Sequence, residues 1–299
     1  MVYTKNTLKN LRDKIPIKKS KKKLTELDLS KIKFFKRDIL GEGAYAKVYK
    51  LRIDLGNNQS KIIDKYVVKK MKILFLKRFY GDYADQEILS FFNKGVIAII
   101  HLSKLGIAPK VFGIHSNIKK NSLYFIIQKL DITLGDMLRN KKFKIEYTDS
   151  FINIMKKLLR TRYRHTDLHV ENIMFNNDEK RFYLIDFGHH KELTKENDEG
   201  FFYTENSESE DIMLFDKTRG FENSILGTSG ASALSQIYKF IVIECLRENI
   251  KALKYLNKLK LFIKTYTSDK NYKNIINLLN KNVGVSDDTY KKLTLMKIL

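Results

Sequence analysis

The 299-residue chain contains one cysteine, two prolines and no tryptophan. The single thiol, Cys245, can form neither an internal disulfide nor a four-cysteine zinc site, so we expect an intracellular, reducing compartment such as cytoplasm, nucleus or a virion interior. With so few prolines, helices and strands can run with few interruptions. The chain also lacks a signal-peptide pattern and any apolar run of membrane-spanning length, so we expect no transmembrane segment.

Acidic residues are scarce, with 34 against 57 lysines and arginines, which gives a net charge of +23. A field of this sign attracts phosphate-bearing partners such as nucleotides, nucleic acid or anionic lipid. A lysine-, isoleucine- and asparagine-rich composition caused by coding bias explains the charge equally well. Hydrophobic residues make up 43% and aromatic residues 12% of the chain, enough for one domain or two lobes, which excludes a disordered chain.

Residues 1–33 are polar and rich in lysine, and they precede the first strand-like pattern. We interpret them as a basic N-terminal tail, either a solvated extension or an arm for nuclear targeting or nucleic-acid binding. From Phe34 to Val68 the pattern is extended and is interrupted by a glycine-containing turn after Leu40 and by residues 56–58. This pattern predicts three antiparallel strands joined by turns.

Helical spacing over residues 83–104, a short strand after Pro109 and another over residues 123–128 complete the N-terminal part of the pattern. Together with the three preceding strands they predict a small antiparallel sheet and one helix within residues 34–130. The sequence therefore favours an α+β fold with a sheet-based first lobe.

The rest of the chain, residues 131–299, is mainly helical in pattern. Helices are predicted over residues 134–138, 148–160 and within 232–299, and the helix from Ile250 to Tyr266 has an apolar side formed by Leu253, Leu256, Leu259 and Ile263. We expect this side to pack in the second lobe, with a membrane-surface helix as the alternative. Two short strands, around 173–175 and 182–185, interrupt the helices.

A glycine-containing motif, Gly41-Glu42-Gly43-Ala44-Tyr45-Ala46-Lys47-Val48, lies between two predicted strands. Glycines in such a hairpin let backbone amides approach a triphosphate without obstruction, while Val48 can cover a base. Taken alone, the motif is more typical of an ordinary glycine turn.

A lysine, Lys69, ends the β-branched run Tyr66-Val67-Val68. A lysine held on a strand below the glycine turn can neutralise the α- and β-phosphates of a nucleotide, and a carboxylate is needed to fix its ammonium group. Glu87 is the candidate carboxylate because it falls at the start of the following helix. An edge strand with solvent-facing lysines is the alternative.

The most specific pattern is His165-Thr166-Asp167-Leu168-His169-Val170-Glu171-Asn172, followed after a predicted hairpin by Asp186-Phe187-Gly188. Asp167 can accept or orient the proton of an attacking hydroxyl group. Asn172 and Asp186 supply the hard oxygen ligands that magnesium prefers. The hairpin between the two segments sets their separation.

A transition-metal site is the competing interpretation of the alternating residues His165, Asp167 and His169, because alternation on an extended strand places side chains on one face. No cysteine or further carboxylate cluster completes such a site, and the interpretation leaves Asp186-Phe187-Gly188 unexplained.

The order of these motifs resembles that of the protein kinase superfamily, over residues 36–245. The resemblance implies a bilobal fold that binds ATP and Mg²⁺, with Asp167 and Lys69 as catalytic residues and Asn172 and Asp186 as metal ligands. It also implies a hinge over Lys129–Asp131 whose backbone contacts adenine. The residues that would bind ATP are Leu40, Gly41, Glu42, Gly43, Ala44, Val48, Lys69, Glu87, Gln128 and Leu130.

Several positions depart from the family pattern. Ala46 stands where a third glycine is usual, and Thr166 replaces the arginine that grips a phosphorylated loop, so loop phosphorylation is not expected to regulate the protein. No Ala-Pro-Glu motif follows Gly188. The second lobe is therefore expected to be reduced or divergent, as in kinases of large DNA viruses or bacterial effectors.

The acceptor is the remaining question. The glycine hairpin, the helix glutamate and Asp-Phe-Gly together favour a Ser/Thr protein kinase that acts on protein substrates. His169 replaces the lysine common in such kinases, and Asp-Leu-His is also similar to the aminoglycoside and choline phosphotransferases. The alternatives are thus a small-molecule or lipid-headgroup phosphotransferase, or a catalytically weak basic scaffold that binds nucleic acid or another polyanion.

Overall fold

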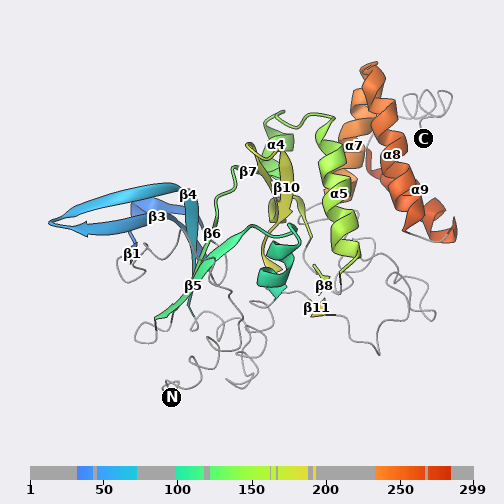
Figure 1. Ribbon diagram of the computed structural model, residues 1–299. Helices are drawn as coiled ribbons and strands as arrows, with labels where there is room; N and C mark the ends of the chain where they lie inside the picture. The colour runs from blue at the N-terminus through green and yellow to red at the C-terminus, as the bar shows by residue number, and fades with distance from the viewer. Residues whose placement is uncertain are drawn as a thin grey trace. The chain divides into compact units, whose positions relative to one another are not determined.

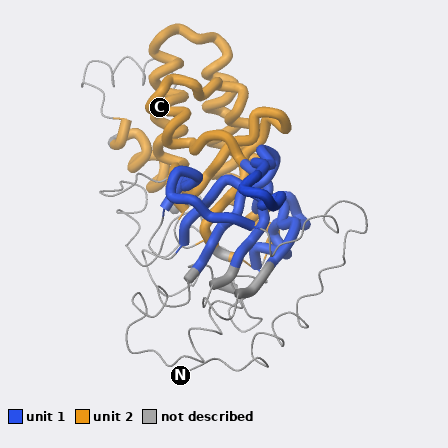
Figure 2. Tube along the Cα trace, turned by 90° about the vertical axis from the view of Figure 1, so that its left-hand side faces the viewer, with its two compact units in different colours: residues 1–129 blue, residues 130–299 orange. Residues whose placement is uncertain are grey.

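The computed structural model divides into two compact units, residues 1–129 and 130–299 (Figure 2). This division lies one residue before the expected boundary between 130 and 131. Both units combine antiparallel strands with helical segments, so the α+β class is confirmed. The structure describes residues 32–42, 46–72, 98–117, 122–161, 163–165, 168–187, 191–192, 233–266 and 269–283.

The first unit contains a six-stranded antiparallel sheet (Figure 1). Its strands are β1 (Ile32–Lys33), β2 (Ile39–Glu42), β3 (Ala46–Gly56), β4 (Gln59–Lys72), β5 (Val111–Asn117) and β6 (Ser122–Gln128). The order is β1-β3-β4-β6-β5, and β2 also pairs with β3. Strand β1 includes the last two residues of the expected tail, and Lys33 forms an ion pair with Asp54 at 2.7 Å.

The predicted turn after β3 is a two-residue hairpin loop. Gly56 pairs with Gln59, and the intervening Asn57 and Asn58 have φ angles of 48° and 60°. Positive φ at both loop positions matches the right-handed twist of the flanking strands, and asparagine tolerates this conformation better than most residues. The three predicted strands β2, β3 and β4 are therefore confirmed, together with the turn that joins β3 and β4.

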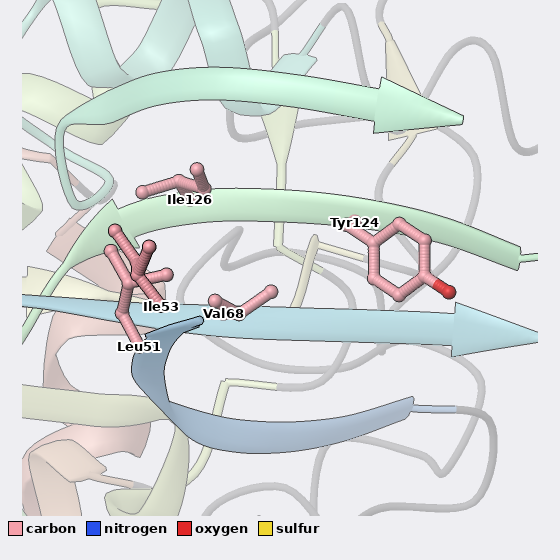
Figure 3. Close-up of a cluster of buried hydrophobic side chains, with 5 residues drawn as sticks. All are labelled: Leu51, Ile53, Val68, Tyr124 and Ile126. Atoms are coloured by element: carbon pink, nitrogen blue, oxygen red, sulfur yellow. The ribbon is translucent and has the colours of Figure 1, made fainter. Parts of the chain in front are cut away.

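A cluster of buried hydrophobic side chains lies on one face of this sheet (Figure 3). Five buried side chains from β3, β4 and β6 form it: Leu51, Ile53, Val68, Tyr124 and Ile126. The ring of Phe34 stacks on Tyr124 at a centroid distance of 5.0 Å, so the segment before β2 is held against the sheet.

A buried ion pair fixes the chain just before β2. Asp38, which is 2% exposed, belongs to the short 3-10 turn η2 (Lys36–Asp38). Its carboxylate accepts from Nε and Nη2 of Arg52 on β3 at 2.6 and 3.0 Å, and this guanidinium lowers the pKa of Asp38. A bidentate ion pair of this kind holds the start of β2 in register with β3.

The helix that precedes β5 is described only over residues 98–104. Gly106, two residues after the last helical residue, has a φ of 68°, which glycine adopts at no steric cost, and the carbonyl group of Leu102 accepts from the amides of Ile107 and Ala108. Leu102 and Ile107 are fully buried, so this helix end packs into the first unit.

The second unit contains helices and two small sheets (Figure 1). The helices are α4 (Leu134–Arg139), α5 (Tyr147–Leu159), the 3-10 turn η4 (Val170–Asn172), α7 (Ala233–Leu246), α8 (Ile250–Thr265) and α9 (Asp269–Val283). Strands β7 (Ile132–Thr133), β9 (Ile173–Asn176) and β10 (Arg181–Leu184) form one sheet in the order β10-β9-β7, and β8 (Tyr163–Arg164) pairs with β11 (Lys191–Glu192).

Helix α5 has the apolar face that its sequence predicts. Phe151, Met155, Leu158 and Leu159 are all at most 5% exposed, and the helix packs against β10 and α8. Helices α7 and α9 are joined by a hydrogen bond from the hydroxyl of Tyr238 to Oδ1 of Asn280 at 2.6 Å.

The apolar side predicted for α8 needs one correction. Leu256, Leu259 and Ile263 are buried as expected, whereas Leu253 is 43% exposed. The buried stripe of α8 runs through Ala252 instead, because Ala252 and Leu256 lie one helical turn apart and both face the packed side. Among the described residues, no helix is long and apolar enough to span a bilayer.

Candidate functional site

The glycine motif lies on the β2–β3 hairpin of the first unit. Gly41 pairs with Val48, and the exposed Glu42 forms an ion pair with Lys47 across the hairpin at 2.5 Å. Leu40, at the same end, is 47% exposed. Gly43 and Ala44, which were predicted to contact phosphate, lie outside the described residues.

Lys69 lies next to this hairpin in the sheet. It pairs with Val48 on one side and with Phe125 of β6 on the other, so Gly41, Val48, Lys69 and Phe125 form one row across four strands. Directly paired residues in an antiparallel sheet point to the same face, so the Lys69 and Val48 side chains share a face. Its expected partner Glu87 lies outside the described residues.

The predicted hinge follows β6. The amide of Lys129 donates to the carbonyl of Lys65 at 3.2 Å, and the amide of Asp131 donates to the carbonyl of Phe175 at 3.0 Å. Between them, the Leu130 amide donates no hydrogen bond to any residue that the structure describes. Gln128 is fixed through Lys110, whose amide donates to Oε1 of Gln128 at 3.3 Å.

The β9–β10 hairpin places the two predicted metal ligands at its open end. Ile173 pairs with Leu184 in the last register position, and the amide of Ile185 donates to the carbonyl of Asn172 at 2.9 Å. Asn172 precedes β9 and Asp186 follows Ile185, so these two residues flank the same end on opposite strands. The predicted hairpin between the two motif segments is therefore confirmed.

Asp186 has an unusual backbone conformation for a residue other than glycine. Its φ angle is 61°, in the left-handed region, where aspartate and asparagine are more frequent than other L-residues. The conformation turns the chain sharply after β10 and carries Phe187 into the interior, where it is 1% exposed. Strained backbone of this kind persists where surrounding contacts hold it.

His165 provides such a contact. Its Nε2–H donates to the carbonyl of Ile185 at 2.7 Å, and its ring packs against that of Phe187 at a centroid distance of 4.7 Å. His165 is 3% exposed, so this is an interior link between the two motif segments. Through this contact His165 anchors the backbone next to Asp186.

His169 lies beside Asn172 and contacts its carboxamide. Nε2 of His169 is 2.9 Å from Nδ2 of Asn172, and Nδ1 of the same ring is 3.2 Å from the amide of Glu171 at the start of η4. Asn172 is 7% exposed, so its carboxamide is held in the interior. Among the described residues, His165 thus contacts Ile185, whereas His169 contacts Glu171 and Asn172.

Glu171 ties this segment to α4. Its carboxylate accepts from the hydroxyl of Thr133 at 2.8 Å and from Arg139 at 2.6 Å, and Thr133 also caps α4 by accepting from the amide of Asp136. Glu171 and Asp136 both raise the pKa of Arg139, Glu171 the more strongly. A Cβ on Gly135 would overlap the Glu171 carboxylate, so any larger residue there requires that carboxylate to move.

The predicted catalytic base, Asp167, lies outside the described residues, as does Gly188. Within the part of the chain that is described, no group of three or more histidine, cysteine, aspartate or glutamate side chains could hold a metal ion. The sequence did not predict the roles of Phe187 as a ring partner of His165 or of Glu171 as a link to α4. Their position inside the motif was the only signal available.

Comparison with models of known protein families found no match, and a search of curated proteins found none either.

Proposed function

We propose that this protein is an ATP- and Mg²⁺-dependent phosphotransferase with the protein kinase fold, acting on serine or threonine hydroxyl groups of proteins. The proposal rests on the β9–β10 hairpin, because Asn172 and Asp186 lie at its open end. The amide of Ile185 donates a hydrogen bond to the carbonyl of Asn172 and fixes the backbone at this end. An amide and a carboxylate at this spacing are the ligand pair that the motif pattern requires.

The ligand set fits magnesium better than a transition metal. Asn172 and Asp186 offer hard oxygen atoms, and magnesium is typically held by one or two such ligands together with the phosphates of its substrate. His165 and His169 are engaged with Ile185 and Asn172 rather than with each other. When bound, the metal would offset charge on the β- and γ-phosphates.

Features of the first unit support the proposal that the protein binds ATP. Val48 and Lys69 share a face of the sheet beside the glycine hairpin, and Leu130 is the second residue after β6. Lys69 would pair with the phosphates, the glycine hairpin would cover them, and the backbone near Leu130 would contact adenine. Glu87 would orient the ammonium group of Lys69.

Phosphoryl transfer requires little covalent assistance from the protein, so the chain's own task is positioning and charge stabilisation. Asp167 would orient the attacking hydroxyl and accept its proton. Asn172 and Asp186 would hold the metal, and Lys69 would neutralise charge on the nucleotide. The contacts made by His165 and Glu171 would keep this loop in place before any substrate binds.

The experiment is transfer of labelled phosphate from ATP, with mass spectrometry to identify the acceptor residue. Asp167→Asn, Lys69→Met and Asp186→Asn should each abolish transfer while the variants remain folded by circular dichroism. Two matched controls should retain it: Lys70→Met, at the next position of β4, and Asp178→Asn, in the exposed turn between β9 and β10.

Substantial transfer by Asp167→Asn or Lys69→Met would contradict the assigned roles. The same assay separates the alternatives, because a protein mixture and a panel of small hydroxyl compounds are offered in parallel. Transfer only to small compounds would favour the phosphotransferase alternative suggested by Asp167-Leu168-His169. Tight nucleic-acid binding without binding of Mg²⁺-ATP would favour a basic scaffold instead.

A further inference from the structure

We propose that the outer face of helix α8 binds the surface of a membrane that contains anionic lipid. The outer face consists of six exposed residues of the helix: Ile250, Leu253, Lys254, Asn257, Leu261 and Lys264. It lies opposite the buried stripe through Ala252 and Leu256. Because α8 contributes no residue to the candidate site, this surface is independent of the proposed function.

Contacts within the second unit determine which side of α8 faces outward. The helix packs against α5, α7 and α9 (Figure 1), and its buried stripe lies on the packed side. One flank faces α5, because Lys251 pairs with Glu146 at 3.4 Å and Lys258 pairs with Asp149 at 2.7 Å. At about 3.6 residues per turn, the six outer residues fill the remaining arc, which is about 100° wide.

Exposed aliphatic side chains are concentrated on this face. Ile250 is 93% exposed, Leu261 65% and Leu253 43%. Among the described residues of the second unit, no other large hydrophobic side chain is exposed. Ile250 and Leu261 lie three helical turns apart, about 16 Å along the axis. Single exposed aliphatic residues are ordinary, whereas several on one helix face indicate an interaction surface.

The charge on α8 is of one sign. The helix contains five lysines and no aspartate or glutamate. Lys254 and Lys264, on the outer face, have no ion-pair partner among the residues that the structure describes. Lysine stems can lie along apolar surface while their ammonium groups reach lipid phosphates. The outer face therefore offers aliphatic groups and unpaired positive charge together.

This combination favours anionic lipid over other partners. The backbone of a nucleic acid would pair with the lysines but would leave the aliphatic side chains in water. A second copy bound through the same face about a two-fold axis would set lysines against lysines. At the surface of an anionic bilayer, aliphatic side chains enter the boundary between headgroups and acyl chains, and lysines meet the headgroups. The net charge of +23 adds long-range attraction.

The first test is co-sedimentation of the full chain with vesicles. We expect binding to phosphatidylcholine vesicles that contain roughly one third phosphatidylserine, and at least about ten-fold weaker binding to phosphatidylcholine alone. Ile250→Ser and Leu261→Ser, combined in one protein, should weaken binding at least about ten-fold. Lys254→Gln combined with Lys264→Gln should weaken it by about ten- to thirty-fold.

Matched control variants change the same residue types in the first unit. Leu55→Ser combined with Leu105→Ser removes leucines that are 61% and 43% exposed, and Lys61→Gln combined with Lys65→Gln removes two exposed lysines. Both controls should stay within about two-fold of wild type, because neither touches α8. Every variant retains the basic N-terminal tail, so any binding by the tail is common to all. Equal losses in the controls and the α8 variants would overturn the proposal.

The second test uses the absence of tryptophan from the chain. Leu261→Trp places a single fluorophore on the outer face, and Leu55→Trp places one at an exposed position of the first unit. With anionic vesicles whose acyl chains carry bromine, the emission of Leu261→Trp should shift to shorter wavelength and be quenched, since the indole enters the interface. The emission of Leu55→Trp should stay unchanged. Unquenched emission from vesicle-bound Leu261→Trp would contradict the proposal.

The remaining outcomes separate other partners and the proposed function. Absence of vesicle binding would refute the proposal, and duplex DNA binding that requires Ile250 and Leu261 would assign the face to nucleic acid instead. Without vesicles, the variants of α8 should transfer phosphate from ATP as the wild type does. Loss of the membrane result therefore leaves the proposed function standing, and vesicle binding by a protein that transfers no phosphate leaves the membrane surface standing.

Discussion

Gly135→Ala should destabilise this protein only while Glu171 is present. Gly135 is the second residue of α4 and is fully covered, and a Cβ there would overlap the carboxylate of Glu171. That carboxylate is the flexible end of a side chain, so it can move aside. In moving, it loses the hydrogen bond from the hydroxyl of Thr133, which is 2.8 Å long.

Two effects of opposite sign determine how much Gly135→Ala changes the free energy of unfolding. Alanine is favoured over glycine in a helix by up to about 1 kcal/mol, which alone would stabilise the variant. A hydrogen bond to a charged group contributes about 1.5–3 kcal/mol, and residual overlap adds to the loss. Arg139 is 60% exposed, so its ion pair with Glu171 adds little. We expect a net destabilisation of about 1 kcal/mol.

The effect of Gly135→Ala on the free energy of unfolding should change sign when Glu171 is first replaced by alanine. The added Cβ on residue 135 then meets no carboxylate, and only the helix preference remains, so Gly135→Ala should stabilise by about 0.5–1 kcal/mol. The assay is a double-mutant cycle from urea unfolding curves followed by circular dichroism. A coupling free energy of about 2 kcal/mol is expected, and the same sign in both backgrounds would refute the reasoning.

Three further predictions concern the interior. Arg52 lowers the pKa of Asp38, so their ion pair stabilises the protein above the unfolded pKa of about 4, and this stabilisation is lost as pH falls through the lower folded pKa. Asp38→Asn should therefore reduce the pH dependence of the free energy of unfolding on the acid side. Identical pH profiles for the variant and the wild type would argue against this. Leu256→Ala should lower the free energy of unfolding in urea by about 2–5 kcal/mol, and Leu253→Ala should lower it by less than about 0.5 kcal/mol. Equal losses in the two variants would contradict the packing assigned to α8. Burial raises the pKa of Cys245 to about 11, so a thiol reagent at pH 8 should label it only after unfolding; rapid labelling of the native protein would count against its burial.

The elements that sequence reasoning predicted are those with a strong local signal. The turn at Asn57 and Asn58 follows from residues that adopt positive φ, and the hairpin before Asp186 follows from two short apolar runs around a polar turn. The burial of Leu253 was predicted wrongly, because periodicity shows which side of a helix is apolar but not how far around that side the neighbouring elements cover it. The role of Asp167 stays a prediction.

The contacts that shape the candidate site could not be predicted for a different reason. Thr133 and Glu171 are separated by 38 residues, and His165 and Ile185 by 20, so no local pattern relates them. Nor does a residue type reveal its partner. A histidine two positions after an aspartate does not reveal, for example, that its ring lies 2.9 Å from the carboxamide of Asn172.

These separate contacts hold one short segment from different sides. His165 fixes Ile185 beside Asp186, the amide of Ile185 fixes the backbone of Asn172, and Thr133 fixes Glu171. Because each contact is made within the protein, the proposed ligand pair would be oriented before a nucleotide binds, and the free energy of binding would not be needed to order it. A substitution in α4, remote in sequence, should therefore alter the candidate site through Glu171 even though it touches no ligand.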